Sequence, residues 1–140
     1  MDLKRALTRN RAATAPDHPD PRIRGRRYAI PFQEVWEASV ALAGGGLRGW
    51  TLVETDDMAG RIRAEARTLL FRFTDDVEIR VRLDRDAQTR VDLVSASRVG
   101  KGDLGANARR IRRFLRRLDR KLDVVPSDIL APEEGVGSGN

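Results

Sequence analysis

Cysteine is absent from this 140-residue chain, histidine occurs once, and aromatic residues make up only 5% of it. Without cysteine the protein can form neither disulfides nor thiolate metal sites. The single histidine, His18, lies between Asp17 and Pro19 in a proline-rich segment, without the neighbouring groups that position a catalytic base. The sequence therefore offers no support for cysteine or serine–histidine catalysis.

Long apolar runs are also missing. No stretch of about 18 consecutive apolar residues occurs, so the sequence predicts no membrane-spanning helix. The first residues are basic, but no apolar segment follows them, and a secretory signal peptide is not expected. With 40% hydrophobic residues the chain can bury a modest core within one domain. We expect a soluble, cytoplasmic protein.

Charge is abundant but unevenly distributed. The net charge is +6, and arginine provides all but three of the 27 basic residues. Residues 104–122 hold eight basic residues and one acidic residue, a local charge of +7, whereas residues 123–140 hold four acidic residues and no basic one. We interpret residues 1–27 as a basic, flexible arm, residues 28–122 as a single domain, and residues 123–140 as a flexible tail that is first acidic and then glycine-rich. Such asymmetry suggests an acidic partner or nucleic acid, although a solvated helix face also carries charge.

Hydrophobic periodicity predicts the elements of the domain. Apolar residues recur at helical spacing from Phe32 to Ala43, after Pro31 and before three glycines, which indicates a helix. Alternation of apolar and charged residues predicts four strands, at residues 50–55, 61–68, 77–83 and 90–98, and we expect a short edge strand at residues 28–30. Each strand has one apolar and one charged face. We therefore predict an α+β fold: a two-layer sandwich in which an antiparallel sheet of about four strands carries two helices packed on one face.

The second predicted helix, at residues 104–122, has an apolar stripe opposite a face rich in arginine. It follows Gly100, Gly102 and Gly105, which spell G-x-G-x-x-G. A dinucleotide-binding loop needs a second parallel strand after its helix, and the chain beyond residue 122 offers none, so we predict no cofactor. A helix N-terminus behind glycines attracts anions, but Asp103 would repel an anion at this one.

Three segments, two of which flank this turn, resemble a known family. Residues 73–80 read F-T-D-D-V-E-I-R, and residues 95–100 and 103–111 read S-A-S-R-V-G and D-L-G-A-N-A-R-R-I. Together they closely resemble the domain-of-unknown-function family numbered 1499, over roughly residues 28–118. Val94 replaces a usual arginine and Gly102 a usual serine, which weakens any polar site at this turn. The family has no established activity, so the resemblance implies the fold rather than a function.

The candidate site is a polar cluster within these strings: Asp75, Asp76, Arg98, Asp103 and Asn107. Adjacent carboxylates can exchange protons or hold a hard cation. At turns they more often cap backbone amides and pair with arginines, and we favour this interpretation because nearby arginines compete with a metal. We predict no catalytic residue and no metal site. The favoured function is a non-catalytic binding or interaction module that recognises a small anion or a protein partner.

The alternative hypothesis is nonspecific nucleic-acid binding through the arginine-rich helix and the basic arm. Its candidate residues are Arg109, Arg112, Arg113, Arg116, Arg117 and Arg120. The arginine face of the helix lacks interleaved aromatic residues and matches no groove-reading motif, so binding would rest on phosphate contacts and would weaken steeply with salt. Phe71 and Phe73 interrupt the alternation of their strand, and if nothing covers them they form an apolar patch for a protein partner or a second copy.

Overall fold

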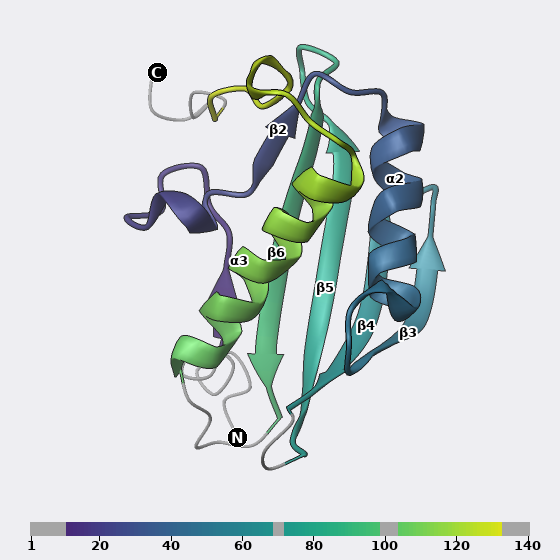
Figure 1. Cartoon of the computed structure of the whole chain (residues 1–140), viewed down its shortest axis with the longest axis vertical. Coiled ribbons are helices and arrows are strands. Elements are labelled where there is room, and N and C mark those ends of the chain that lie inside the picture. The colour runs from purple at the N-terminus through teal and green to yellow at the C-terminus, as the bar shows by residue number, and fades with distance from the viewer. Residues whose placement is uncertain (1–10, 69–71, 99–103, 133–140) are drawn as a thin grey trace.

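The computed structural model describes residues 11–68, 72–98 and 104–132. Within them the chain forms an open antiparallel sheet and two α-helices (Figure 1). The strands are β1 (Arg11–Ala13), β2 (Arg26–Tyr28), β3 (Trp50–Asp56), β4 (Arg61–Arg67), β5 (Thr74–Leu83) and β6 (Thr89–Ser97). The helices are α2 (Phe32–Ala41) and α3 (Leu104–Lys121), and shorter helical turns are η1 (Pro21–Ile23), η2 (Leu42–Gly46) and η3 (Pro126–Asp128).

The strands follow the order β1-β6-β5-β4-β3, and β2 also pairs with β6. β1 pairs with residues 94–96 of β6 and β2 with residues 89–91, so these two short strands share one edge of the sheet. All pairs are antiparallel, and between the consecutive strands β3 to β6 the hairpin connections require this arrangement. The predicted α+β fold with an antiparallel sheet is confirmed, with six strands instead of about four.

Both α-helices cover the same face of the sheet (Figure 1). Alternate residues of the central strands point to that face and are buried, among them Ile62 on β4, Ile79 on β5 and Leu93 on β6. From α3 the buried apolar side chains are Ile111, Phe114, Leu115 and Leu118. Burying each of these large side chains contributes about 1.5–3 kcal/mol, which is why this stripe holds α3 on the sheet despite its charge.

The two additional strands come from the segment that we expected to be a flexible arm. Its described part, from residue 11, supplies β1, η1 and most of β2. Three-residue strands are too short to display an alternating pattern, so periodicity could not reveal them. Contacts with Asp119 on α3 fix the end of this segment. Arg26 Nη2 lies 2.9 Å from Asp119 Oδ2, and the Tyr28 hydroxyl donates a hydrogen bond to the same carboxylate.

The described part of the predicted tail, residues 123–132, also lies against the sheet. The Ala29 N–H donates to the Asp128 carbonyl at 2.8 Å, and the Leu130 N–H donates to the Arg27 carbonyl at 2.7 Å. Tyr28 and Ile129 form an isolated antiparallel bridge. This part of the tail therefore extends the backbone hydrogen bonding along β2.

The connection from α2 to β3 positions the cavity described below. Gly49 has φ +86°, and a Cβ at this position would lie 2.9 Å from the carbonyl oxygen of Arg67. Glycine permits both the backbone conformation and the close approach. The Arg67 N–H donates to the Gly49 carbonyl at 2.9 Å, so Arg48 and Trp50 are held against the end of β4.

Candidate functional site

A buried polar network joins the first turns of α3 to the sheet. We call it the polar lock: Asp75 on β5, Ser95 and Ser97 on β6, and Asn107 and Arg110 on α3. Asp75 is 3% exposed and Asn107 is 1% exposed. The Arg110 Nη1 atom lies 2.8 Å from Asp75 Oδ2, so the buried carboxylate has a charged partner. Burial without such a partner would be strongly unfavourable.

Hydrogen bonds connect the other four members of the polar lock, and the ion pair with Arg110 joins Asp75 to them. The Ser95 hydroxyl donates to Asn107 Oδ1 at 2.8 Å, and Asn107 Nδ2 donates to Ser97 Oγ at 3.0 Å. Arg110 Nη1 donates to Ser95 Oγ at 3.0 Å and to Asn107 Oδ1 at 2.9 Å. Because these side chains are directed at one another, the lock fixes the position of α3 and of the Arg110 guanidinium.

The sheet separates the four described residues of the predicted polar cluster. Asp75 and Asn107 meet in the polar lock on the helix-covered face. Asp76 and Arg98 meet on the opposite face, where Arg98 Nη2 lies 2.7 Å from Asp76 Oδ1 and 2.6 Å from Glu65 Oε2. Hydrogen bonds to Asp76 and then to Glu65 raise the pKa of Arg98. Asp103 lies outside the described residues.

Arg110 was not among the predicted site residues, although it contacts the buried carboxylate. Two sequence signals could have identified it. Asn107 and Arg110 are three residues apart and so share one face of a helix. Ser95 and Ser97 are two apart and so share one face of a strand. Polar residues with both spacings, in segments whose apolar faces must meet, predict a buried network.

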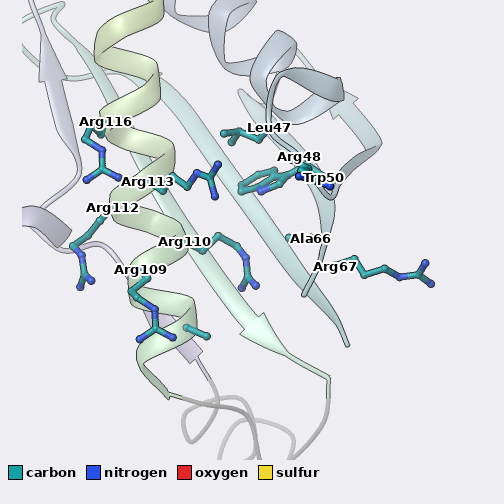
Figure 2. Close-up of a pocket in the computed structure, with 11 residues that line it drawn as sticks. Leu47, Arg48, Trp50, Ala66, Arg67, Arg109, Arg110, Arg112, Arg113 and Arg116 are labelled. Carbon is teal, nitrogen blue, oxygen red and sulfur yellow. The ribbon is translucent and has the colours of Figure 1, made fainter. Parts of the chain in front are cut away.

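A cavity of about 530 Å³ lies between α3 and the edge of the sheet (Figure 2). We call it the arginine groove. Its eleven lining residues include seven arginines and no carboxylate. They are Leu47, Arg48, Trp50, Ala66, Arg67, Ala106, Arg109, Arg110, Arg112, Arg113 and Arg116. Four of the predicted nucleic-acid residues are thus among those that line a concave site.

The arginines of the groove differ in direction. Figure 2 shows Arg110 and Arg113 extending from α3 toward the side on which Trp50 lies, whereas Arg67 extends away from α3. The Trp50 ring is stacked on Phe114, with ring centroids 5.5 Å apart. The centre of the groove therefore combines two guanidinium groups with a supported indole ring.

The arginines also differ in their partners. Arg110 is held in the polar lock, and Arg112 lies 3.7 Å from Asp20. Among the described residues, Arg48, Arg113 and Arg116 form no ion pair with a carboxylate. Part of the positive charge of the groove is therefore not neutralised within the described chain.

A row of exposed arginines runs along the outer side of α3, and it continues past the groove to Arg120. Arg109, Arg113, Arg116 and Arg120 are exposed, and their spacing places them along one side of the helix. Arg117 instead turns toward η2, where its Nη2 donates to the Gly46 carbonyl at 3.3 Å. The candidate nucleic-acid residues therefore divide between a ridge along α3 and its two flanks.

A second cavity, of about 240 Å³, lies beside β2 and is also lined by arginines. Two of those arginines, Arg27 and Arg90, form hydrogen bonds with other groups of the chain. Arg90, which is 2% exposed, donates from Nη2 to Asp92 Oδ1 and to the Arg24 carbonyl, each at 2.8 Å. Arg27 donates from Nε to Asp84 at 2.7 Å. This cavity has less capacity for an external anion than the arginine groove has.

Phe73 is 40% exposed, and Phe71 lies outside the described residues. His18 Nδ1 accepts a hydrogen bond from the Asp20 N–H at 3.0 Å, within the loop before η1. In the described part of the chain, no group of three or more His, Cys, Asp or Glu residues is arranged to hold a metal. None of the helices described is both long and apolar enough to cross a membrane.

Fold and site together define a small α+β domain with helices on one face of an open antiparallel sheet and an arginine-lined cavity beside the second helix. The chain belongs to the family described as Protein of unknown function (DUF1499), whose model matches residues 3–118. The resemblance inferred from the polar strings is confirmed, and the match extends further toward the N-terminus than the expected residue 28. No curated protein and no solved structure matches the chain significantly.

Proposed function

We propose that this protein is a non-catalytic binding module that takes an anionic ligand in the arginine groove. The observation that carries the proposal is the composition of one cavity: seven arginines and no carboxylate among eleven lining residues. Like charges gathered in one place destabilise a folded chain and raise the local concentration of anions. A bound anion would relieve this repulsion.

Preorganisation also supports the proposal. Arg110 is already fixed by the polar lock, so a ligand that contacts it does not have to immobilise a long side chain. Arg113 is exposed, and among the described residues it has no carboxylate partner. Its side chain is therefore available to contact the ligand. The planar guanidinium group can bind carboxylate or phosphate oxygens through two parallel hydrogen bonds.

Thermal unfolding with millimolar pyrophosphate tests this proposal, because a ligand that binds only the folded state raises Tm with its concentration. At 100 times the Kd, the expected gain is about 2.7 kcal/mol. Arg113→Gln should lose most of the gain. Arg120→Gln, which removes an exposed arginine of α3 that does not line the groove, should keep it. Equal stabilisation of the wild type and Arg113→Gln would contradict the proposal.

A second candidate is nonspecific nucleic-acid binding, supported by the ridge of Arg109, Arg113, Arg116 and Arg120. Positions spaced by about 1.5 Å per residue place the ends of this ridge about 16 Å apart, enough to follow several phosphates. Arg120→Gln distinguishes the two candidates, because it removes the end of the ridge and leaves the groove intact. A labelled single strand that binds Arg120→Gln several-fold more weakly, with an affinity falling steeply between about 50 and 200 mM salt, would favour this candidate.

A further inference from the structure

The arginine groove is larger than an inorganic anion requires. Its volume of about 530 Å³ falls within the range of pockets that hold small organic molecules, about 300–1,000 Å³. A phosphate or sulfate ion would occupy only a fraction of that space. The inference that follows rests on the proposed anion binding and concerns the remainder of the ligand.

The rest of the cavity wall is apolar. Leu47 and Ala66 contribute buried side chains, and Ala106 lies in the first turns of α3. Trp50 is half-buried, and one side of its ring packs on Phe114. Aromatic rings favour offset stacking, and a ring that is already supported on one side offers a rigid surface to another.

The charged and the apolar walls face the same space. Figure 2 shows the Arg113 side chain directed toward Trp50 and Arg110 placed lower on the same side of α3. A ligand lying in the groove would therefore contact guanidinium groups at one end and an indole ring at the other. Guanidinium groups also stack on the faces of aromatic rings, so they can contact the face of a flat ring as well as its anionic group.

We infer that the ligand of the arginine groove is a flat aromatic compound bearing a phosphate or a comparable anionic group. The anionic group lies against Arg110 and Arg113, and the ring lies along Trp50. Inorganic anions then fill only the charged end of the groove, and neutral aromatic compounds fill only the apolar end. Each should bind more weakly than a compound that combines the two features.

Calorimetric titration of the full chain with three probes tests this inference. The probes are 1-naphthyl phosphate, methyl phosphate, which carries the anion without the ring, and 1-naphthol, which carries the ring without the anion. We expect the Kd of 1-naphthyl phosphate to be at least about tenfold lower than that of either of the other two probes. Arg113→Gln should weaken both phosphates, and Arg120→Gln should leave all three affinities unchanged.

Two further variants test the position of the ring. Trp50→Leu should reduce the preference for naphthyl over methyl phosphate to less than about threefold while methyl phosphate binding stays the same. Because Trp50 also packs on Phe114, this variant could lose its fold. Ala106→Leu provides an independent test: Ala106 lines the groove from α3, leucine suits a helix, and the larger side chain would take up space that a ring-bearing ligand needs. It should lower naphthyl phosphate affinity selectively.

The outcomes separate this inference from the proposal on which it rests. Equal affinity for naphthyl and methyl phosphate, or an unchanged preference in Ala106→Leu, would overturn the aromatic ligand and leave anion binding intact. If 1-naphthol binds as tightly as 1-naphthyl phosphate, the charged end has no role and both fall. If no probe binds, both fall as well.

Discussion

Asp75 and Asp76 are neighbours in the sequence, yet substituting them should have very different effects on stability. Asp75 belongs to the polar lock, where its side chain is 4% exposed and that of its partner Arg110 is 12% exposed. Asp76 pairs with Arg98 on the other face, where the two side chains are 54% and 49% exposed. Both side chains are carboxylates on one strand, so their burial is the main difference between them.

Asp75→Asn keeps the shape of the side chain and removes its charge, which leaves the Arg110 guanidinium buried without a counterion. Breaking one partner of a buried pair costs about 3–5 kcal/mol, and we expect about 3 kcal/mol because the asparagine oxygen still accepts a hydrogen bond. That is a large part of the total stability of about 5–15 kcal/mol typical of a domain. For a chain of this size the loss should lower Tm by roughly 10 °C.

Urea unfolding of the wild type, Asp75→Asn and Asp76→Asn measures this difference. Asp76→Asn should change the midpoint little, because an exposed ion pair is screened by water and salt. The slope of the free energy against urea should stay the same in all three, which shows that the folded and unfolded states keep their compactness. Equal losses in the two variants, or a negligible loss in Asp75→Asn, would refute the importance assigned to the polar lock.

Three other consequences can be measured. Burial raises the pKa of Asp84, but hydrogen bonds from Arg27 and from backbone N–H groups outweigh it and hold the pKa below the ordinary 3.8. The contribution of the ionised Asp84 to stability is therefore complete above pH 3.8 and is lost as the pH falls through the folded-state pKa. Asp84→Asn should make Tm depend less steeply on pH in the acid range. An unchanged acid dependence of Tm would contradict this. Gly60→Ala should destabilise the fold strongly, because φ is +67° and the added Cβ would lie 2.1 Å from a β5 carbonyl oxygen. Gly44→Ala is the control, because a Cβ at Gly44 meets only ordinary contacts. Similar unfolding midpoints for the two variants would contradict this. Without anions at low salt, Arg113→Gln should raise stability by a few tenths of a kcal/mol, as expected when like charges on one helix are separated, and a loss of stability would argue against repulsion in the groove.

Much of the fold was predictable from periodicity. The central strands and α3 have apolar faces that must be buried together, which determines an antiparallel sheet with helices on one side. β1 was not predictable in this way, and the short edge strand expected at residues 28–30 overlaps β2 only at Tyr28, because both strands are three residues long and held by backbone pairing with β6. Their position depends on contacts with residues about 60–85 positions later in the chain, which no local pattern reports.

The candidate site was predicted in part, and its division between two faces has a simple cause. We placed Asp75 and Asp76 in a turn and therefore expected them to act together. β5 in fact begins at Thr74, so both lie on a strand, where successive side chains point to opposite faces. Continuing the alternation of Val77, Ile79 and Val81 back by one step would have assigned Asp75 to the core.

The arginine groove required the tertiary structure. The arginines of α3 were visible in the sequence, but Trp50 lies about 60 residues earlier and reaches them only through the turn at Gly49 and the stacking on Phe114. The sequence alone therefore showed a basic helix without aromatic neighbours. Folding places the indole ring and an apolar wall beside these arginines around one cavity.

The most direct test of the central claim is a nuclear magnetic resonance titration of the ¹⁵N-labelled full chain with 1-naphthyl phosphate. The Trp50 indole N–H and the Arg113 side-chain N–H report on the groove, and the Arg98 side-chain N–H reports on the opposite face. We predict saturable shifts at Trp50 and Arg113 with no change at Arg98. Shifts centred on Arg98, or no saturable shift up to about 10 mM ligand, which corresponds to binding weaker than about 3 kcal/mol, would contradict ligand binding in the arginine groove.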